Sequence, residues 1–210
     1  NRNLGTAWRR TTYSDASWKS GPGLLGLENS ALPDPGIETE INKGSQLCYY
    51  FRKQFTYNGD PSEVTLTIDQ IVDDGAVYYL NGTEVGRSRM PGGAVRFTTS
   101  SSATVTNAAE EKGVVTIGPG KLKNGSNVLA VEVHQTNTTS SDIVFGCRLS
   151  ASVPAAKGVV INEIHPIVGK DAYIEFYNPT DKVIDLRDYY LSDDPGYLNK
   201  RKISRPLKIA

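Results

Sequence analysis

The sequence lacks long hydrophobic runs and an excess of charge of either sign. None of its apolar stretches approaches the roughly 20 residues that a helix needs to span a bilayer, so we expect no membrane insertion. Its 23 Lys and Arg residues balance 23 Asp and Glu residues, which argues against a nucleic-acid partner. The N-terminus has neither a signal peptide nor an initiator methionine, and we expect a mature or excised piece of a longer protein.

Cysteine is scarce as well. The two cysteines, Cys48 and Cys147, are too far apart for a CxxC metal or redox motif. They can form a disulfide, as in a secreted protein, or remain two buried free thiols. In an alternating strand pattern Cys147 shares a face with Phe145, whereas Cys48 is out of phase with Tyr49 and Phe51. The sequence leaves both alternatives open.

Motifs of catalysis are also missing. His134 lies in an alternating strand pattern and His165 precedes a proline, and neither has a partner at metal-ligand spacing. The sequence contains no nucleophile elbow, and residues 118–121 lack the spacing of a phosphate-binding loop. We therefore predict that these residues include no catalytic group and are not an enzyme, although a catalytic domain can lie elsewhere in a longer chain.

The residues that are abundant favour short strands and turns. The chain contains 20 Gly, 11 Pro and 11 Tyr residues, a composition that suits β-structure better than helices. Residues 73–87 hold two turn signals, Asp-Gly at 74–75 and Asn-Gly at 81–82, around the apolar run 76–80. Together with the alternating residues 64–69, they predict a three-stranded meander in an antiparallel sheet.

Further strand patterns make the prediction all-β. About eight strands at regular spacing, with long loops at 1–46 and 88–109, favour an antiparallel jelly-roll β-sandwich over residues 1–152. Residues 153–158 have the composition of a linker, and residues 159–210 predict a second, smaller β domain. The remaining strands are predicted at residues 47–57, 113–117, 127–134 and 143–151 in the first domain and at 159–164, 173–177, 183–186 and 189–191 in the second.

Two pairs of aspartates are candidate calcium ligands. These are Asp73 and Asp74 before a glycine, and Asp193 and Asp194 before a proline. Calcium takes six to eight oxygen ligands, which loops rich in Asp, Asn and Gly supply. The alternative is that these aspartates cap turns by accepting bonds from their own backbone. Calcium is the one cofactor that the sequence suggests, and none is required.

Aromatic residues and sequons suggest two kinds of contact with sugars. Trp18, Tyr78 and Tyr79 are candidate glycan contacts if their rings are exposed in a line, whereas the alternative for the tryptophan is that it plugs the end of the sandwich. Three Asn-x-Ser/Thr sequons are candidate N-glycosylation sites in a secretory pathway. Two of them coincide with Asn-Gly turns, which explains these residues without a glycan. The sequons begin at Asn81, Asn124 and Asn137.

Four stretches carry a family resemblance over residues 1–152. They are WKSGP at 18–22, YFRKQF at 50–55, DDGAVYYLNG at 73–82 and NVLAVEVHQ at 127–135. In this order they resemble the galactose-binding-like jelly-roll domains of bacterial secreted proteins. Such domains are mostly non-catalytic, and some bind glycans or calcium. The resemblance implies a non-catalytic sandwich.

Residues 159–210 resemble a second family. VINEI at 160–164, YIEFYNP at 173–179 and DLRDYYLSDD at 185–194 look like the start of a lamin-tail domain, an immunoglobulin-like (Ig-like) β-sandwich found in large bacterial surface or secreted proteins. Such a sandwich takes roughly a hundred residues, so we expect a partial domain that is incomplete at its C-terminus. Either a continuing chain or strands from a neighbouring copy would complete it.

The fold class that follows is all-β, with an antiparallel jelly-roll β-sandwich followed by a partial Ig-like β-sandwich. We predict a non-catalytic extracellular or cell-surface module that serves adhesion, glycan contact or surface assembly. The alternative is an accessory carbohydrate-binding region of a larger secreted hydrolase. The expected partners are glycans or neighbouring copies of the chain. An exposed line of aromatic rings would favour glycans, whereas buried rings would favour assembly.

Overall fold

The chain forms two compact units that consist almost entirely of β-structure. The computed structural model describes residues 3–153, 158–166 and 172–210. Unit 1 is Asn1–Val153 and unit 2 is Pro154–Ala210, and residues 154–157 of the predicted linker lie outside the described residues. Within the described ranges, the helical turns are η1 (Ala7–Arg9) and η2 (Pro61–Glu63). None of the described helices is long and apolar enough to cross a membrane.

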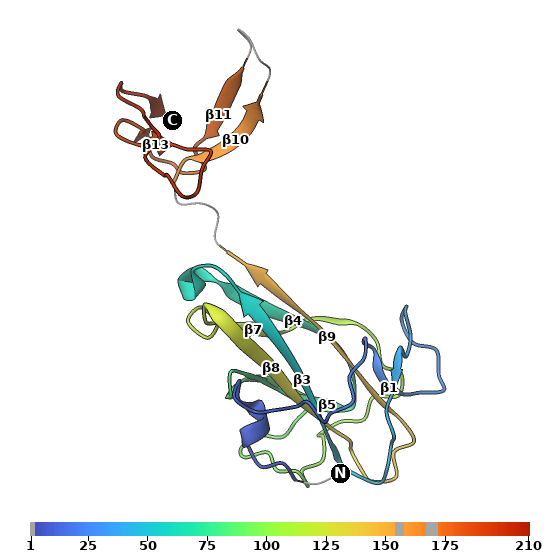
Figure 1. The fold of residues 1–210 in the computed structure, drawn as a ribbon. Helices are drawn as coiled ribbons and strands as arrows, with labels where there is room; N and C mark the ends of the chain where they lie inside the picture. Colours follow the sequence, from blue (N-terminus) through green and yellow to red (C-terminus); the bar gives the residue numbers. More distant parts are fainter. Residues whose placement is uncertain (1–2, 154–157, 167–171) are drawn as a thin grey trace. The chain divides into compact units, whose positions relative to one another are not determined.

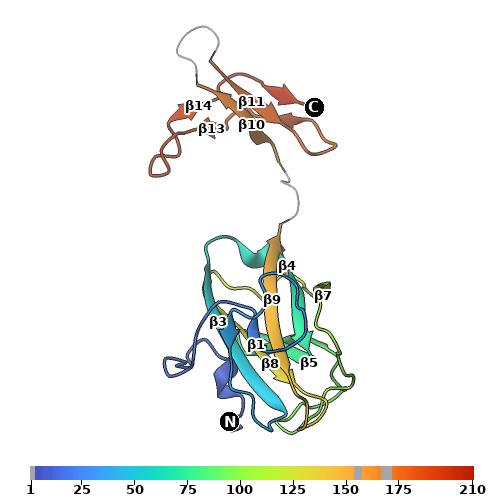
Figure 2. The ribbon, with the colours of Figure 1, turned by 90° about the vertical axis from the view of Figure 1, so that its right-hand side faces the viewer.

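Unit 1 is a sandwich of two sheets (Figures 1 and 2). Its strands pair antiparallel, except that β1 and β2 are parallel. The all-β sandwich predicted from the sequence is therefore confirmed. The first sheet has the order β2 (Thr39–Glu40), β1 (Leu25–Leu27), β9 (Ile143–Ser152), β4 (Thr65–Asp73) and β7 (Glu111–Ile117), and the second has the order β3 (Cys48–Tyr57), β8 (Gly125–His134), β5 (Gly75–Leu80) and β6 (Thr83–Ser88).

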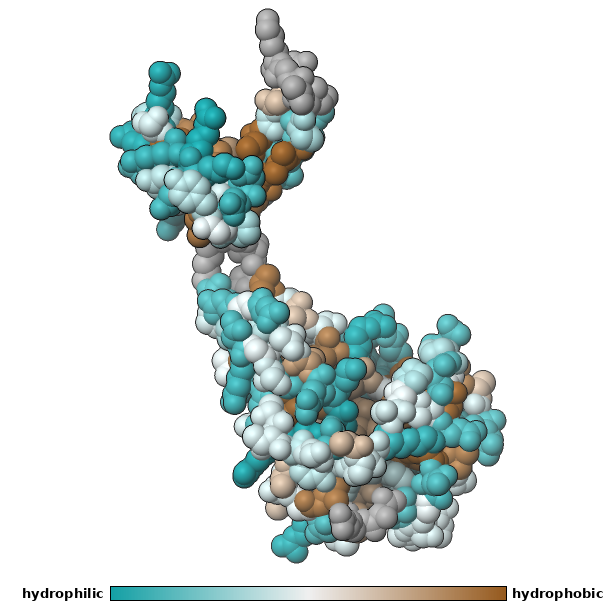
Figure 3. Space-filling model, in the orientation of Figure 1, coloured by the Kyte–Doolittle hydropathy of each residue, from teal (hydrophilic) through white to brown (hydrophobic). Residues whose placement is uncertain are grey.

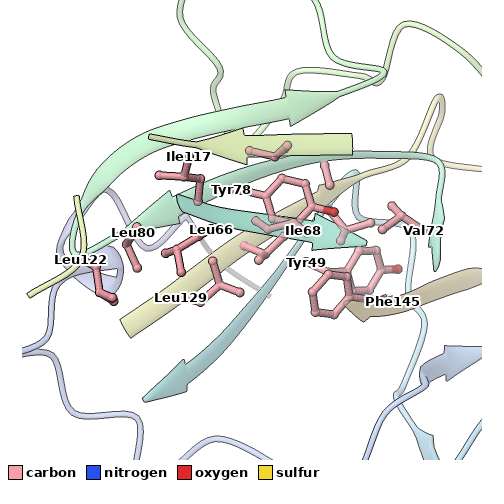
Figure 4. Packing of buried hydrophobic residues seen from close by; sticks show 14 of the residues in the cluster. Tyr49, Leu66, Ile68, Val72, Tyr78, Leu80, Ile117, Leu122, Leu129 and Phe145 are labelled. Atoms are coloured by element: carbon pink, nitrogen blue, oxygen red, sulfur yellow. The ribbon is translucent and has the colours of Figure 1, made fainter. Parts of the chain in front are cut away.

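The core lies between these two sheets and follows from the alternation of the strands. Along β4, Leu66, Ile68, Gln70 and Val72 are buried, while Thr67, Asp69 and Ile71 between them are only partly covered. The buried apolar side chains pack against Tyr78 of the opposite sheet and Phe145 of the neighbouring strand (Figure 4). Burying a side chain of this size stabilises the fold by about 1.5–3 kcal/mol. The alternating pattern thus decides which face of each strand turns toward the core.

The two turn signals in residues 73–87 have different outcomes. Asn81 and Gly82 have φ values of 53° and 91° between β5 and β6, as the predicted hairpin requires. The predicted meander is wrong at its first turn, because β4 and β5 belong to different sheets. The chain crosses between the layers at Asp74. Gly75 is needed there, since a Cβ would lie 2.7 Å from the Arg89 carbonyl oxygen.

Two long segments cover the outer face of the second sheet. The N-terminal segment with η1 contacts β8, and Trp8 of this segment is completely buried. Its ring packs on Tyr50 and Tyr79 with centroid distances of 4.7 and 5.8 Å. The loop between β6 and β7 contributes Met90 to the same cluster. This face of the sheet is therefore a second, smaller interior rather than a solvent surface.

Unit 2 has little interior of its own among the described residues. Three antiparallel strand pairs form it, and Leu186 is its one buried hydrophobic residue there. Large apolar side chains stay exposed, and Figure 3 shows some of them in brown near β10 and β11. The pairs are β10 (Val160–His165) with β11 (Tyr173–Tyr177), β12 (Ile184–Asp185) with β15 (Lys208–Ile209), and β13 (Tyr190–Leu191) with β14 (Arg201–Lys202).

Candidate metal centre

The last residue of β4, Asp73, carries a buried carboxylate without hydrogen-bond partners. The residue as a whole is only 1% exposed to solvent. Neither carboxylate oxygen has a partner within the described part of the chain. A buried ionised carboxylate without a partner costs several kcal/mol. The carboxyl group avoids this cost either by holding a proton or by binding a group that is not part of the chain.

Strand pairing brings two further carboxylates to Asp73. Glu28 directly follows β1 and Asp142 directly precedes β9, and these two strands pair with Leu27 opposite Ile143. The same strand β9 pairs with β4 on its other side. One oxygen from each of the three side chains lies within 4.8 Å of the other two. Three separate segments thus converge on one point.

The remaining oxygens of these acids are held by their own loops. Glu28 Oε1 accepts hydrogen bonds of 2.7 Å from the backbone N–H groups of Asn29 and Ser30, while its Oε2 is buried without a partner. Ser140 Oγ donates to Asp142 Oδ1 at 2.9 Å. The loops therefore fix both carboxylates and leave oxygen atoms free to face the aspartate.

The electrostatics of the cluster favour a cation. Burial, together with the neighbouring Asp74, Asp142 and Glu28 carboxylates, raises the pKa of Asp73 from its ordinary value of 3.8 to about 8. A divalent ion would neutralise this repulsion and give the bare oxygens their partners. Carboxylate oxygens are the ligands that calcium and magnesium prefer. The residues present thus fit a hard cation.

This pKa gives a pH dependence in calcium-free buffer. The folded protein holds a proton on Asp73 that the unfolded chain releases near pH 4, so the stability from this proton is complete below about pH 4. It is lost as the pH rises through about 8. The unfolding free energy should fall by up to about 1.4 kcal/mol per pH unit in this window. Urea titrations in a chelator measure it, and Asp73→Asn should remove this component. An equal slope in the variant would contradict the assignment.

The neighbouring Asp74 has a different role from the one predicted. Its carboxylate accepts bonds from the Val105 N–H at 2.7 Å and from both the N–H and the hydroxyl of Thr136 at 2.8 Å. Its oxygens are thus already satisfied by groups from two loops. The prediction that it binds calcium is corrected accordingly. Asp74 fastens the loops around the crossing between the sheets.

The prediction that Asp193 and Asp194 bind calcium is also corrected. Lys200 Nζ forms an ion pair with Asp193, whose side chain is largely exposed. Asp194 Oδ1 accepts a 2.8 Å bond from the Gly196 N–H, and its own N–H donates to Ser192 Oγ. These are the contacts of a turn cap. No third acid joins this pair among the described residues.

Of the two alternatives for the cysteines, the structure shows the free thiols and no disulfide. Cys48 is buried and faces outward from the second sheet toward Glu132, whereas Cys147 is exposed and lines the cleft beside β9, in the same phase as Phe145, so the expectation of two buried thiols is wrong for Cys147. Different layers separate the two sulfur atoms, which a disulfide must join at about 2 Å.

The predicted line of exposed aromatic rings is wrong for two of its three members. Tyr78 is buried in the core, where its hydroxyl donates to Gln70 Oε1 at 2.5 Å. Tyr79 is buried on the opposite face of β5 and donates to Glu132 Oε1 at 2.5 Å. Neighbouring residues of a strand point to opposite faces, and both faces of β5 are covered here. These rings cannot contact a glycan.

Trp18 differs, because it is half-buried beside a cleft. Its ring packs edge-on against Tyr13 with a centroid distance of 5.9 Å. The cleft has a volume of about 660 Å³ and runs between this segment, β3 and β9. Lys19, Arg52 and Lys53 also line it. The tryptophan thus keeps part of its ring available to a ligand.

The three sequons differ in exposure. Asn81 donates to Asn127 Oδ1 at 2.8 Å and accepts from the Val128 N–H at 3.0 Å, so its amide belongs to the hairpin turn. These bonds favour the alternative that the turn explains Asn81, and a glycan on it stays a prediction. Asn124 and Asn137 are exposed and stay predictions. They lie in the turns before and after β8.

Sequence reasoning missed two of the three clustered acids. Glu28 and Asp142 stand beside strands that are far from Asp73 along the chain. The usable signal was the position of each acid at a strand end, but it becomes a site only when β1, β9 and β4 are known to be neighbours. The sequence carries no short motif for that pairing.

No protein-family model and no curated protein matches this chain. Solved structures do match: a β-glycosidase from Bacteroides vulgatus has 16% identity over 87% of this chain and 24% of its own, with a TM-score of 0.35. A calcium-binding mutant of Bacteroides uniformis β-glucuronidase 2 has 12% identity, 88% and 22% coverage and a TM-score of 0.39. A β-glucuronidase from glycoside hydrolase family 2 has 16% identity, 88% and 21% coverage and a TM-score of 0.35.

This chain spans less than a quarter of the length of each of these glycosidases. Their low TM-scores carry no argument about its site or its activity. The two-layer sandwich of unit 1 itself fits the resemblance to galactose-binding-like domains.

Proposed function

We propose that this chain is a non-catalytic, calcium-binding module of an extracellular or cell-surface protein and serves surface assembly. The observation that carries the assembly role is the open apolar groove of unit 2. Ile161, Ile164, Ile174 and Leu191 line this groove of about 680 Å³. Ile164 is 59% exposed. Isolated exposed apolar residues are ordinary, but a contiguous set marks a contact surface.

A neighbouring copy of the chain is the partner that we propose for this groove. Asp193, Lys200 and Arg201 stand at its edge, so the surface presents both signs of charge around an apolar centre. Such a mixed rim suits a self-complementary contact, in which each copy offers both charges to the other. The lamin-tail resemblance of unit 2 supports the same idea, since an Ig-like sandwich would cover this face with further strands.

The calcium part of the proposal rests on the cluster of Glu28, Asp73 and Asp142. Its three carboxylates, two of them with bare buried oxygens, match the hard ligands of calcium. Extracellular modules bind calcium with dissociation constants on the order of 10⁻⁴–10⁻³ M, which suits an outside location. The cation would tie the ends of β1, β4 and β9 together and make unit 1 a rigid support.

Sedimentation equilibrium tests the assembly role. We expect wild-type protein to dimerise or oligomerise with increasing concentration, and Ile164→Lys to remain monomeric because it places a charge in the groove. The matched control is Val183→Lys, an exposed apolar residue of the same unit that does not line the groove. It should associate like the wild type. A wild type that is monomeric at all concentrations would contradict the proposal.

The second candidate function is an accessory carbohydrate-binding region of a larger hydrolase. The cleft beside Trp18 favours it, because a partly exposed tryptophan and two lysines line the same hollow. Tyr78 and Tyr79 are buried, however, and cannot extend this ring into a line. Calorimetric titration with oligosaccharides distinguishes the two functions. Oligosaccharide binding by the wild type that is lost in Trp18→Ala would favour the hydrolase context. A wild type that binds no oligosaccharide would favour assembly.

A further inference from the structure

A second cluster of metal-ligating side chains lies on the covered outer face of the second sheet. Cys48 on β3 stands directly opposite His134 on β8 in the strand register. Glu132 is two residues before the histidine, so it points to the same face. All three residues are buried, with the glutamate 2% exposed. The cluster belongs to different strands and a different face from the calcium site.

The distances bring the three ligating atoms close to a common centre. Glu132 Oε2 lies 3.9 Å from Cys48 Sγ and 3.7 Å from His134 Nε2. All three atoms lie within 4.8 Å of one another. Ligands around a tetrahedral zinc ion are separated by about 3.4–3.6 Å, given bonds of about 2.0–2.3 Å. The two distances from the glutamate thus exceed this spacing by only a few tenths of an ångström.

The histidine is oriented as a ligand. Its Nδ1 lies 2.7 Å from the carbonyl oxygen of Thr99, which can only accept, so this nitrogen carries the proton. Nε2 then faces the cluster and has no hydrogen-bond partner among the described residues. A backbone carbonyl that holds the far nitrogen is the usual support of a metal-bound histidine.

The glutamate is likewise held in place by hydrogen bonds to one of its two oxygen atoms. The Tyr79 hydroxyl donates to its Oε1 at 2.5 Å and the Arg9 guanidinium at 3.2 Å. Oε2 therefore remains for the cluster. Each of the two side chains thus uses one atom for support and presents the other to the centre.

We propose that Cys48, Glu132 and His134 bind a zinc ion. Thiolate and imidazole are soft to intermediate ligands that suit zinc and not calcium or magnesium. The cysteine thiol would release its proton to solvent as the metal–sulfur bond forms, and a water molecule can take the fourth position.

The supporting groups show what this ion would do. Arg9 and Thr99 belong to the N-terminal segment and the β6–β7 loop, the two segments that cover the sheet. A zinc ion bound beneath them would fasten both to β3 and β8. The alternative is a buried ion pair between Glu132 and a protonated His134, without metal.

Cobalt substitution distinguishes zinc binding from the ion pair. The full chain is stripped of metal with a chelator, saturated with calcium to fill the acidic site, and titrated with Co²⁺. We expect one cobalt per chain with a thiolate-to-cobalt charge-transfer absorption, and displacement by one equivalent of Zn²⁺. His134→Gln should weaken cobalt binding by at least about 100-fold. No charge-transfer band in the wild type would overturn the proposal.

The second cysteine supplies a matched control. Cys147→Ser removes the other thiol and should keep the full charge-transfer band, whereas Cys48→Ser should lose it. If Cys48→Ser fails to fold, alkylation answers the same question in Cys147→Ser. The single remaining thiol of that variant is Cys48. Zinc should slow the reaction of this thiol with iodoacetamide at least about 10-fold under mildly unfolding conditions. Equal alkylation with and without zinc would contradict the assignment.

Discussion

Replacing Glu132 by alanine in metal-free protein should lower the unfolding free energy by about 3–5 kcal/mol. Its carboxylate accepts hydrogen bonds from Arg9 and Tyr79 at the buried outer face of the second sheet. Without it, a guanidinium with only 16% of its side chain exposed loses its partner. The tyrosine hydroxyl also becomes a buried group without an acceptor. The cost therefore comes from the groups that the substitution leaves behind.

Thermal and urea denaturation measure this loss, which corresponds to a Tm decrease of about 6–20 °C for a domain of this size. Glu84→Ala is the matched control. Glu84 pairs with Arg87 at 2.7 Å, but both side chains are partly exposed. An exposed pair contributes about 0–1 kcal/mol. If both variants lost equal stability, the buried network would not be the support that its geometry indicates.

Calcium at about 100 times its dissociation constant should raise the unfolding free energy of the wild type by about 2.7 kcal/mol. The physical reason is that the ion binds the assembled Glu28, Asp73 and Asp142 carboxylates and has no equivalent site in the unfolded chain. Calorimetric scans with calcium and with a chelator should therefore differ in Tm by about 5–11 °C. Magnesium should act less, because it demands a stricter geometry and gives up its water reluctantly.

Two aspartate variants separate this site from its neighbour. Asp73→Asn should abolish the response to calcium and, in chelator at neutral pH, exceed the wild type in stability, because the wild type must take up a proton on Asp73 when it folds and asparagine needs none. Asp74→Asn should be less stable in both conditions, since it weakens the bonds to Val105 and Thr136. It should nevertheless keep most of the calcium response. A full response in Asp73→Asn would place the ion elsewhere.

Local pattern predicted the strands well where one face meets the core. Residues 47–57 and 127–134 alternate, and β3 and β8 occupy nearly these bounds. The Asn81-Gly82 hairpin follows from the positive φ that its turn needs. The crossing at Asp74 could not be predicted in this way. Its Asp-Asp-Gly sequence is also that of a tight turn, and only the distant Arg89 and loop groups decide that the chain changes layer.

Both metal clusters depend on pairing between distant strands. Asp73 was recognisable as an acid at a turn, but its partners come from the ends of β1 and β9. In the sequence His134 has no partner at metal-ligand spacing, and Cys48 joins Glu132 and His134 only through the register of β3 with β8. The alternation of residues along one strand predicts the face on which a side chain lies, but it does not predict which strand pairs with that strand.

Isothermal titration of calcium into chelator-treated protein tests the central claim most directly, namely that one end of unit 1 is a calcium site. The acids Glu28, Asp73 and Asp142 predict one ion per chain for the wild type. They predict the same stoichiometry for Asp194→Asn and no binding for Asp73→Asn. The contradicting result would be a wild type that takes up no calcium, or an Asp73→Asn protein that binds it as the wild type does.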